Sequence, residues 1–302
     1  MLFCETFRNP LRVTSMSQLQ IKEMIKKTLK ILMAFIALML LSLYLVGLWK
    51  LRSQTLEKSS LTIMQSALSL EDGLTVAARF GCTSCHGEAL SGGKVWPIPS
   101  LIATVEPPAL AGRTITDEQW VKAVRHGLDH ENQPLLFMPS TAYQQISDQE
   151  LSAIIQWSRN QKVSTTNENQ TQLGLLGPIM VGIGMLELST DHIEKNSRKS
   201  QVQPAANREY GAVLAQVCAQ CHGSEFAGRP LDSQGPPAGP DIRGSSLLNE
   251  KHGWNKDNFS AFFKSGTKPD GTKVSQLMPW QALGVGYQDT QIDALWKYLS
   301  SL

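Results

Sequence analysis

The chain has 302 residues, about twice the size of a common protein domain, so we expect two folded domains. Charged residues make up 18% of the chain, which is below the roughly 25% of ordinary soluble proteins and disfavours long disordered segments. The net charge of +2 argues against a strongly basic nucleic-acid-binding protein, so no nucleic-acid partner is expected. The charge is uneven, because residues 1–52 carry a net charge of +6 and residues 53–302 carry −4.

The first predicted element is an uncharged apolar run at residues 31–49. As a helix rising about 1.5 Å per residue it would be about 28 Å long, close to the roughly 30 Å core of a bilayer. A lysine cluster precedes the run, and positive residues favour the cytoplasmic side. We therefore predict a single-pass helix at 31–49 in a bacterial inner membrane, with residues 1–30 cytoplasmic and the rest of the chain periplasmic. The cluster consists of Lys22, Lys26, Lys27 and Lys30.

Two other interpretations of this run remain open. A cleaved signal peptide would have an apolar core of about 7–15 residues followed by small residues at the cleavage site. The run is longer than that, and residues 48–52 (LWKLR) make a poor cleavage site. A core helix of a soluble domain is also disfavoured, because the run is apolar on all sides.

The rest of the chain repeats one module, first over residues 70–160 and again over residues 205–302. In each copy a C-x-x-C-H motif comes first, then a proline-rich stretch and a helix-like segment, and a Met-Pro pair precedes a final amphipathic segment. The histidine of the motif and the methionine are 52 residues apart in the first copy and 56 in the second. Such an ordered repeat predicts two domains with the same fold.

Each C-x-x-C-H motif is an attachment sequence for a c-type haem. Two thiols three positions apart can form thioether bonds with both vinyl groups of one porphyrin, and the adjacent histidine can ligate its iron. We therefore predict two covalently bound haem c groups. The predicted attachment residues are Cys82, Cys85, Cys218 and Cys221, and the predicted iron-ligating histidines are His86 and His222.

Two other uses of a C-x-x-C pair fit less well. Structural zinc would need four ligands, and neither module offers a second Cys/His pair at zinc-finger spacing. A thiol-disulfide site would usually sit in a βαβ pattern, which the sequence lacks.

Met138 and Met278 are the predicted second axial ligands of the two irons, because they occupy matching places in the repeat and methionine is an established haem ligand. A bis-histidine scheme would instead use His126, His130 or His252. None of these histidines has a counterpart in the other copy, so we expect them at the surface or in loops.

The C-x-x-C-H motifs, the later Met-Pro pairs and the segment at residues 173–195 together resemble the membrane-anchored dihaem cytochromes c, over roughly residues 70–302. This family is built from two class I cytochrome c domains in tandem. The resemblance implies an all-α fold, with the two terminal helices of each domain crossing. It also implies that a proline carbonyl accepts a hydrogen bond from the ligating histidine, a role that Pro108 and Pro240 match by position.

A linker at residues 161–204 separates the modules, and its middle is apolar from Leu173 to Leu188. At about 16 residues with an internal proline, this stretch is marginal for spanning a membrane. A second crossing would also place the second module in the cytoplasm, away from haem attachment. We therefore expect a short helix packed on or between the modules.

The expected function is that of an electron carrier with no catalytic residues and no small-molecule substrate, because two protein ligands on each iron leave no open position. The resemblance implies transfer between a periplasmic dehydrogenase or quinol-linked complex and an acceptor such as an oxidase. A dedicated subunit of one such complex is the alternative, and a dihaem peroxidase would require one iron to lose its methionine. Module 1 carries a net charge of −4, which favours a basic partner.

Overall fold

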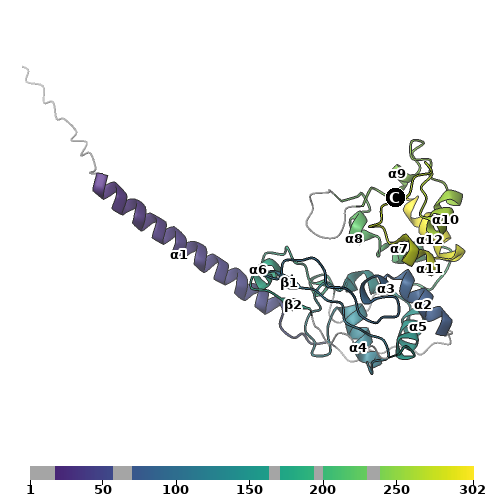
Figure 1. Cartoon of the computed structure of the whole chain (residues 1–302), viewed down its shortest axis with the longest axis horizontal. Helices are drawn as coiled ribbons and strands as arrows, with labels where there is room; N and C mark the ends of the chain where they lie inside the picture. Colours follow the sequence, from purple (N-terminus) through teal and green to yellow (C-terminus); the bar gives the residue numbers. More distant parts are fainter. Residues whose placement is uncertain (1–17, 57–69, 163–170, 194–199, 230–238) are drawn as a thin grey trace, which may run out of the picture.

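The computed structural model describes residues 18–56, 70–162, 171–193, 200–229 and 239–302. A single long helix, α1 (Gln18–Lys50), extends away from two small helical modules (Figure 1). The first module is drawn in blue to teal and the second in green to yellow. The fold class is helical, as predicted, and the described residues contain one short ladder of two strands, which joins module 1 to the linker.

Helix α1 is long and apolar enough over Gln20–Lys50 to cross a membrane. It begins before the predicted run at 31–49, so the lysine cluster forms its first turns rather than a separate segment. Its side chains from Gln20 to Ser42 are exposed, and Leu43 is half-buried. An all-round apolar and exposed surface of this kind suits lipid contact.

Module 1 is built from four short helices and two irregular turns. Its N-terminal helix crosses its C-terminal helix at Gly73, where an added Cβ would collide with Trp157 and with the Ala153 carbonyl. The helices are α2 (Leu70–Arg79), α3 (Cys82–His86), α4 (Asp117–Val121) and α5 (Asp148–Arg159), and the turns are a π-helical turn (Lys122–His126) and a 3-10 turn (Ser140–Tyr143).

The terminal helices of module 2 cross in the same way as those of module 1. Its first helix crosses its last helix at Gly211, where an added Cβ would collide with the Ala294 carbonyl. The crossing of terminal helices that the resemblance implies is therefore present in both modules. The helices are α7 (Arg208–Ala215), α8 (Ala219–His222), α9 (Gly244–Leu247), α10 (Lys256–Ser265), α11 (Trp280–Gly286) and α12 (Asp289–Leu299).

Local sequence signals explain where α4, α5 and α10 begin. The side chains of Thr116, Ser147 and Asn255 each accept a hydrogen bond from the backbone three residues on, and the residue there bonds back to the cap. Such capping boxes satisfy amide groups that have no partner inside the helix. The apolar faces of α5 and α12 are buried, including Leu151 and Leu295.

The linker packs against module 1 and against α1. Strand β1 (Ala103–Thr104) pairs antiparallel with β2 (Gln172–Leu173), and helix α6 (Gly177–Gly182) follows. Helix α6 lies in the apolar middle of the linker, where a short helix is expected from the sequence. Its contact with α1 was not foreseen, since a helix on or between the modules was expected.

The two modules pack directly on each other through α2 and α11. A Cβ added at Gly286 of α11 would collide with the backbone of Arg79 in α2. Buried residues of both modules, such as Phe80 and Leu214, belong to one continuous hydrophobic cluster. The described parts of the modules therefore form one packed unit.

Candidate functional site

Each C-x-x-C-H motif lies on a single helical turn. Cys82 and Cys85 are three positions apart in α3, so their thiols lie on one face of the turn. Gly81 before the motif and Gly87 after it both have positive φ angles, of 73° and 82°. The second motif ends in the same way, with Gly223 at a φ of 81°. Both turns present two thiols and one imidazole together.

The loop that follows each histidine has the same backbone course in both modules. Leu90 and Phe226, each four residues after its histidine, have positive φ angles of 55° and 58° and are buried. Their amides donate to Gly87 O and Gly223 O, at 2.9 Å in both cases. The repeat in sequence is therefore also a repeat in backbone geometry.

A proline carbonyl faces the ring of each motif histidine. His86 Nδ1 lies 2.8 Å from Pro108 O, and His222 Nδ1 lies 2.7 Å from Pro240 O. A proton on Nδ1 is donated to the carbonyl, which leaves Nε2 without a proton and able to ligate a metal. Burial lowers the pKa of both histidines, and this also favours the neutral ring that ligates iron.

The first cysteine of each motif is half-buried. Desolvation raises the pKa of the Cys82 and Cys218 thiols to about 12. Thiol-disulfide sites require the opposite shift, toward a reactive thiolate. Among the described residues, no group of three His, Cys, Asp or Glu side chains is placed to hold a metal ion by itself. The geometry of the described residues therefore favours neither a thiol-disulfide site nor a structural zinc site.

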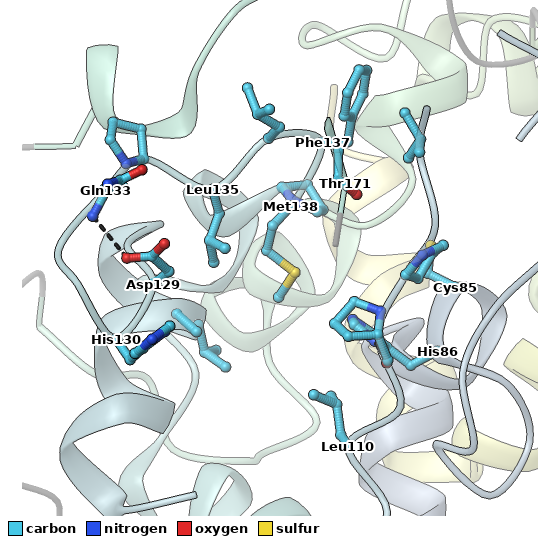
Figure 2. A pocket seen from close by; sticks show the side chains of 18 of the residues that line it. Cys85, His86, Leu110, Asp129, His130, Gln133, Leu135, Phe137, Met138 and Thr171 are labelled. Carbon is cyan, nitrogen blue, oxygen red and sulfur yellow. Dashed lines mark hydrogen bonds between the residues drawn. The ribbon is translucent and has the colours of Figure 1, made fainter. Parts of the chain in front are cut away.

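A cavity of about 880 Å³ opens beside the first motif. Figure 2 shows the His86 ring and the Met138 thioether entering this cavity. The walls are mostly apolar, and they include Leu90, Val105 and Ile154. An imidazole and a thioether that enter one apolar space are the ligand pair expected of a methionine-ligated haem.

The cavity also contains a polar group that needs a partner. The indole Nε1 of Trp120 is buried in the cavity wall and has no hydrogen-bond partner among the described residues. A buried N–H without an acceptor is costly, and a haem propionate would supply one. The residues of module 1 therefore fit a haem in shape, ligands and polarity.

The Met-Pro loops of the two modules also match. The Ser140 amide donates to Met138 O at 2.9 Å, and the Trp280 amide donates to Met278 O at 2.8 Å. Met138 and Met278 are half-buried, and both pack against the hydrophobic cluster. Each methionine thus lies on a tight turn of its own module.

The structure corrects one expectation about the spare histidines. His126 was expected at the surface or in a loop, but it is buried, because the π-helical turn directs this segment into module 1. His130 and His252 are exposed. The neighbouring Arg125 is also buried, where it donates to Ile146 O and pairs with Asp148 at 2.9 Å.

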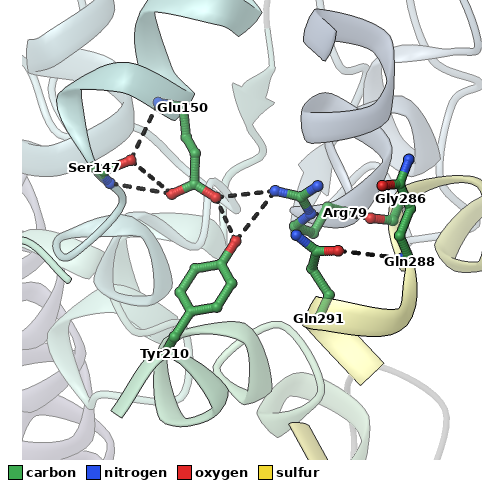
Figure 3. A network of polar contacts seen from close by, with 7 residues as sticks. All are labelled: Arg79, Ser147, Glu150, Tyr210, Gly286, Gln288 and Gln291. Carbon is green, nitrogen blue, oxygen red and sulfur yellow. Dashed lines mark hydrogen bonds and ion pairs between the residues drawn. The ribbon is translucent and has the colours of Figure 1, made fainter. Parts of the chain in front are cut away.

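Sequence reasoning missed a buried polar network between the modules (Figure 3). Arg79 Nη1 lies 3.1 Å from both Glu150 Oε1 and the Tyr210 hydroxyl, and Tyr210 donates to Glu150 at 2.5 Å. Arg79 Nε also donates to Gly286 O at 2.9 Å. Burial raises the pKa of Tyr210, with the nearby Glu150 carboxylate as a second cause, so the hydroxyl keeps its proton.

A signal for this network does exist in the sequence. Arg79 lies three residues before its C-x-x-C-H motif, where module 2 has Ala215. Glu150 precedes the apolar residue Leu151, and the matching residue in module 2 is Gln291. A charged residue whose counterpart in the other copy is neutral indicates a contact in which the two modules contribute different side chains.

Comparison with protein families assigns both modules. Residues 69–157 match the family model described as "Cytochrome C oxidase, cbb3-type, subunit III". Residues 209–302 match the family model described as "Cytochrome c". No curated protein matches the chain.

Proposed function

We propose that this chain, which belongs to the c-type cytochromes and carries two cytochrome c domains in tandem, passes single electrons along a membrane surface. Its α1 would anchor it in a bacterial inner membrane, with both modules in the periplasm. The donor would be a periplasmic dehydrogenase or a quinol-linked complex, and the acceptor a protein such as an oxidase.

The residues that would hold the two haem groups follow from the matched geometry of the motifs. A haem c in each module would supply a one-electron iron couple, which methionine ligation shifts to higher potential. Pro108 and Pro240 orient the ligating imidazoles. The proposed attachment and ligand residues are Cys82, Cys85, His86 and Met138 in module 1, and Cys218, Cys221, His222 and Met278 in module 2.

The observation that carries the proposal is that the two attachment motifs are neighbours. Gly81 directly precedes Cys82, and Val217 directly precedes Cys218. A Cβ placed on Gly81 would lie 3.4 Å from Val217 Cγ1, which is an ordinary packing distance. The residues that directly precede the two motifs therefore lie side by side across the module interface, which favours electron transfer within one chain.

The buried network keeps the modules in this arrangement. Arg79 and Glu150 belong to module 1, whereas Tyr210 and the Gly286 carbonyl belong to module 2. A buried charge pair bound by several hydrogen bonds resists separation, because opening it would leave unpaired charges. Arg79, Glu150 and Tyr210 are therefore positioning residues for the transfer.

Flash photoreduction of the full-length holoprotein tests this function. We expect the two haem groups to equilibrate with a first-order rate that does not depend on protein concentration. An Arg79→Met variant, with a loosened interface, should show a slower rate, whereas Arg159→Met, at the surface pair with Asp117, should not. A wild-type rate proportional to protein concentration would contradict transfer within one chain.

A second candidate is a dedicated subunit of one oxidase or dehydrogenase complex. The match of residues 69–157 to an oxidase subunit model favours it. Affinity purification from mild-detergent extracts of native membranes separates the two. A dedicated subunit would co-purify with its partners at fixed stoichiometry, and a free carrier would be recovered mainly alone.

A further inference from the structure

The linker contains fourteen consecutive residues without a polar side chain, residues 173–186, here called the apolar connector. Its α6 ends at a turn where Gly184 has a φ of 76°, and the chain then reverses toward Asp191. Four of its large apolar side chains are exposed, which is an unusual concentration for a surface in water. They are Leu175, Leu176, Ile183 and Met185.

The apolar connector runs along the C-terminal end of α1 (Figure 1). A Cβ added at Gly47 would collide with Pro178 O, and one added at Gly182 would collide with Leu43 O. The order of these contacts shows that α6 is antiparallel to α1. Glycine on both helices allows the two backbones to approach closely, as in helix pairs within membranes.

These contacts fix the depth of the connector. Leu43 and Gly47 lie inside the uncharged run at 31–49, and Leu43 is six residues before its end. At about 1.5 Å per residue, the contact with Gly182 lies roughly 9 Å below that end, within the depth of interfacial helices. We propose that the apolar connector is inserted in the outer leaflet beside α1. This inference rests on the proposed anchoring of α1.

The backbone of the connector suits lipid, where every amide needs a partner within the protein. The amide of Gly184 donates to Val181 O at 3.2 Å, and the amides of Met185 and Leu186 donate to Met180 O at 2.9 and 3.1 Å. The amides of the turn at the tip of the connector are therefore bonded without water, at a place where a Cβ added to Gly184 would meet nothing within 4 Å.

Polar contacts lie just above this level. Lys50 at the end of α1 pairs with Asp191 at 2.9 Å. The Gln54 amide donates to Asn132 O of module 1, also at 2.9 Å. This change from apolar to charged contacts places the membrane surface near Lys50 and Asp191.

The insertion has a consequence for electron entry. The cavity of module 1 is lined in part by Tyr44 and Leu48 of α1 and by Leu175 and Pro178 of the connector. The haem site of module 1 therefore lies at the membrane surface. A membrane-bound donor meets module 1 first.

Spin-label depth measurements on the full-length holoprotein test the insertion. A nitroxide is attached at Met185→Cys in a Cys4→Ser background, with the protein reduced and held in phosphatidylcholine–phosphatidylglycerol vesicles. Leu38→Cys in the middle of α1 reports on anchoring, and Leu248→Cys in module 2 is the matched control in water. The three side chains are similarly exposed, at 58%, 62% and 55%.

We expect the ratio of oxygen to nickel-complex accessibility at Met185→Cys to be severalfold above that at Leu248→Cys and closer to that at Leu38→Cys. A lipid-like ratio at Leu38→Cys with a water-like ratio at Met185→Cys would overturn the insertion alone. A water-like ratio at Leu38→Cys would overturn the anchoring itself. Protection of Met185→Cys from both reagents would point to a contact with a second copy, and would also overturn the insertion.

Discussion

The two Met-Pro loops carry the same candidate ligand in different surroundings. In module 1 the linker holds the loop, because Ser189 Oγ donates to Met138 O at 2.7 Å and accepts from the Ser140 amide at 3.0 Å. In module 2 the Met278 carbonyl accepts from its own loop, and Leu277 beside it is 67% exposed. The repeated Met-Pro motif thus places the same candidate ligand in both modules, whereas unrepeated segments such as the linker determine how many hydrogen bonds hold its loop.

The modules also differ in what they contribute to their interface. Module 1 provides a charge pair, Arg79 and Glu150, whereas the matching residues of module 2 are Ala215 and Gln291. Module 2 contributes Tyr210 and a backbone carbonyl instead. The asymmetry means that the two modules fit each other in one arrangement. Four experiments test these differences.

The largest effect is expected from removing the charge of Arg79 at the interface. Arg79→Met leaves Glu150 buried without its cation, which should lower the free energy of unfolding by about 3–5 kcal/mol. Arg159→Met, at an exposed pair, should lower it by about 0–1 kcal/mol. Guanidinium denaturation followed by circular dichroism measures both. If the two variants lost the same free energy of unfolding, the buried pair would stabilise the protein no more than an exposed pair does.

Removing the candidate ligands should change one haem at a time. Met138→Ala and Met278→Ala should each lower one of two one-electron midpoints by on the order of 100 mV, within the roughly 0.8 V range that axial ligands control. Met180→Ala, in the apolar connector, is the control and should shift neither. A spectroscopic redox titration gives the midpoints, and an unchanged titration in either variant would remove that methionine from the ligand set.

Added imidazole should distinguish the two loops. Because the Met278 loop is more exposed and lacks the serine clamp, imidazole should displace its ligand at a concentration about tenfold lower than that needed in module 1, equivalent to ~1.4 kcal/mol. The visible spectrum of the oxidised holoprotein during the titration should therefore show two phases. A single phase would mean that the surroundings do not matter.

The smallest effect is expected at the clamp itself. Ser189→Ala removes the hydroxyl that bonds Met138 O, at a net cost of about 1 kcal/mol. The phase that needs the higher imidazole concentration belongs to module 1, and its midpoint should fall roughly fivefold. The midpoint of the other phase should not change. Ser301→Ala, at a hydroxyl on the surface of module 2, serves as the control. If the phase at the lower imidazole concentration shifted instead, the assignment of the two phases to the modules would be reversed.

Much of this protein could be predicted from local chemistry. The helical class and the membership of the c-type cytochromes are confirmed, because they rest on short motifs whose spacing is read directly from the chain. The haem ligands remain predictions, although His86 and Met138 enter one cavity. His126 was expected at the surface or in a loop but is buried, because burial depends on the packing of segments that are distant in sequence.

The sequence by itself determined the repeat, the motif chemistry and the apolar run. The motifs and the run each lie within one helical turn or one helix length, and the repeat follows from a direct comparison of the two copies. The tertiary structure alone decided which surfaces meet. Arg79 contacts Glu150 and Tyr210, which are 71 and 131 residues later in the chain. Gly182 packs against Leu43, although all of module 1 lies between them in the sequence. Such contacts arise from the shape of packed elements, and a close approach at glycine leaves no periodic pattern along the chain.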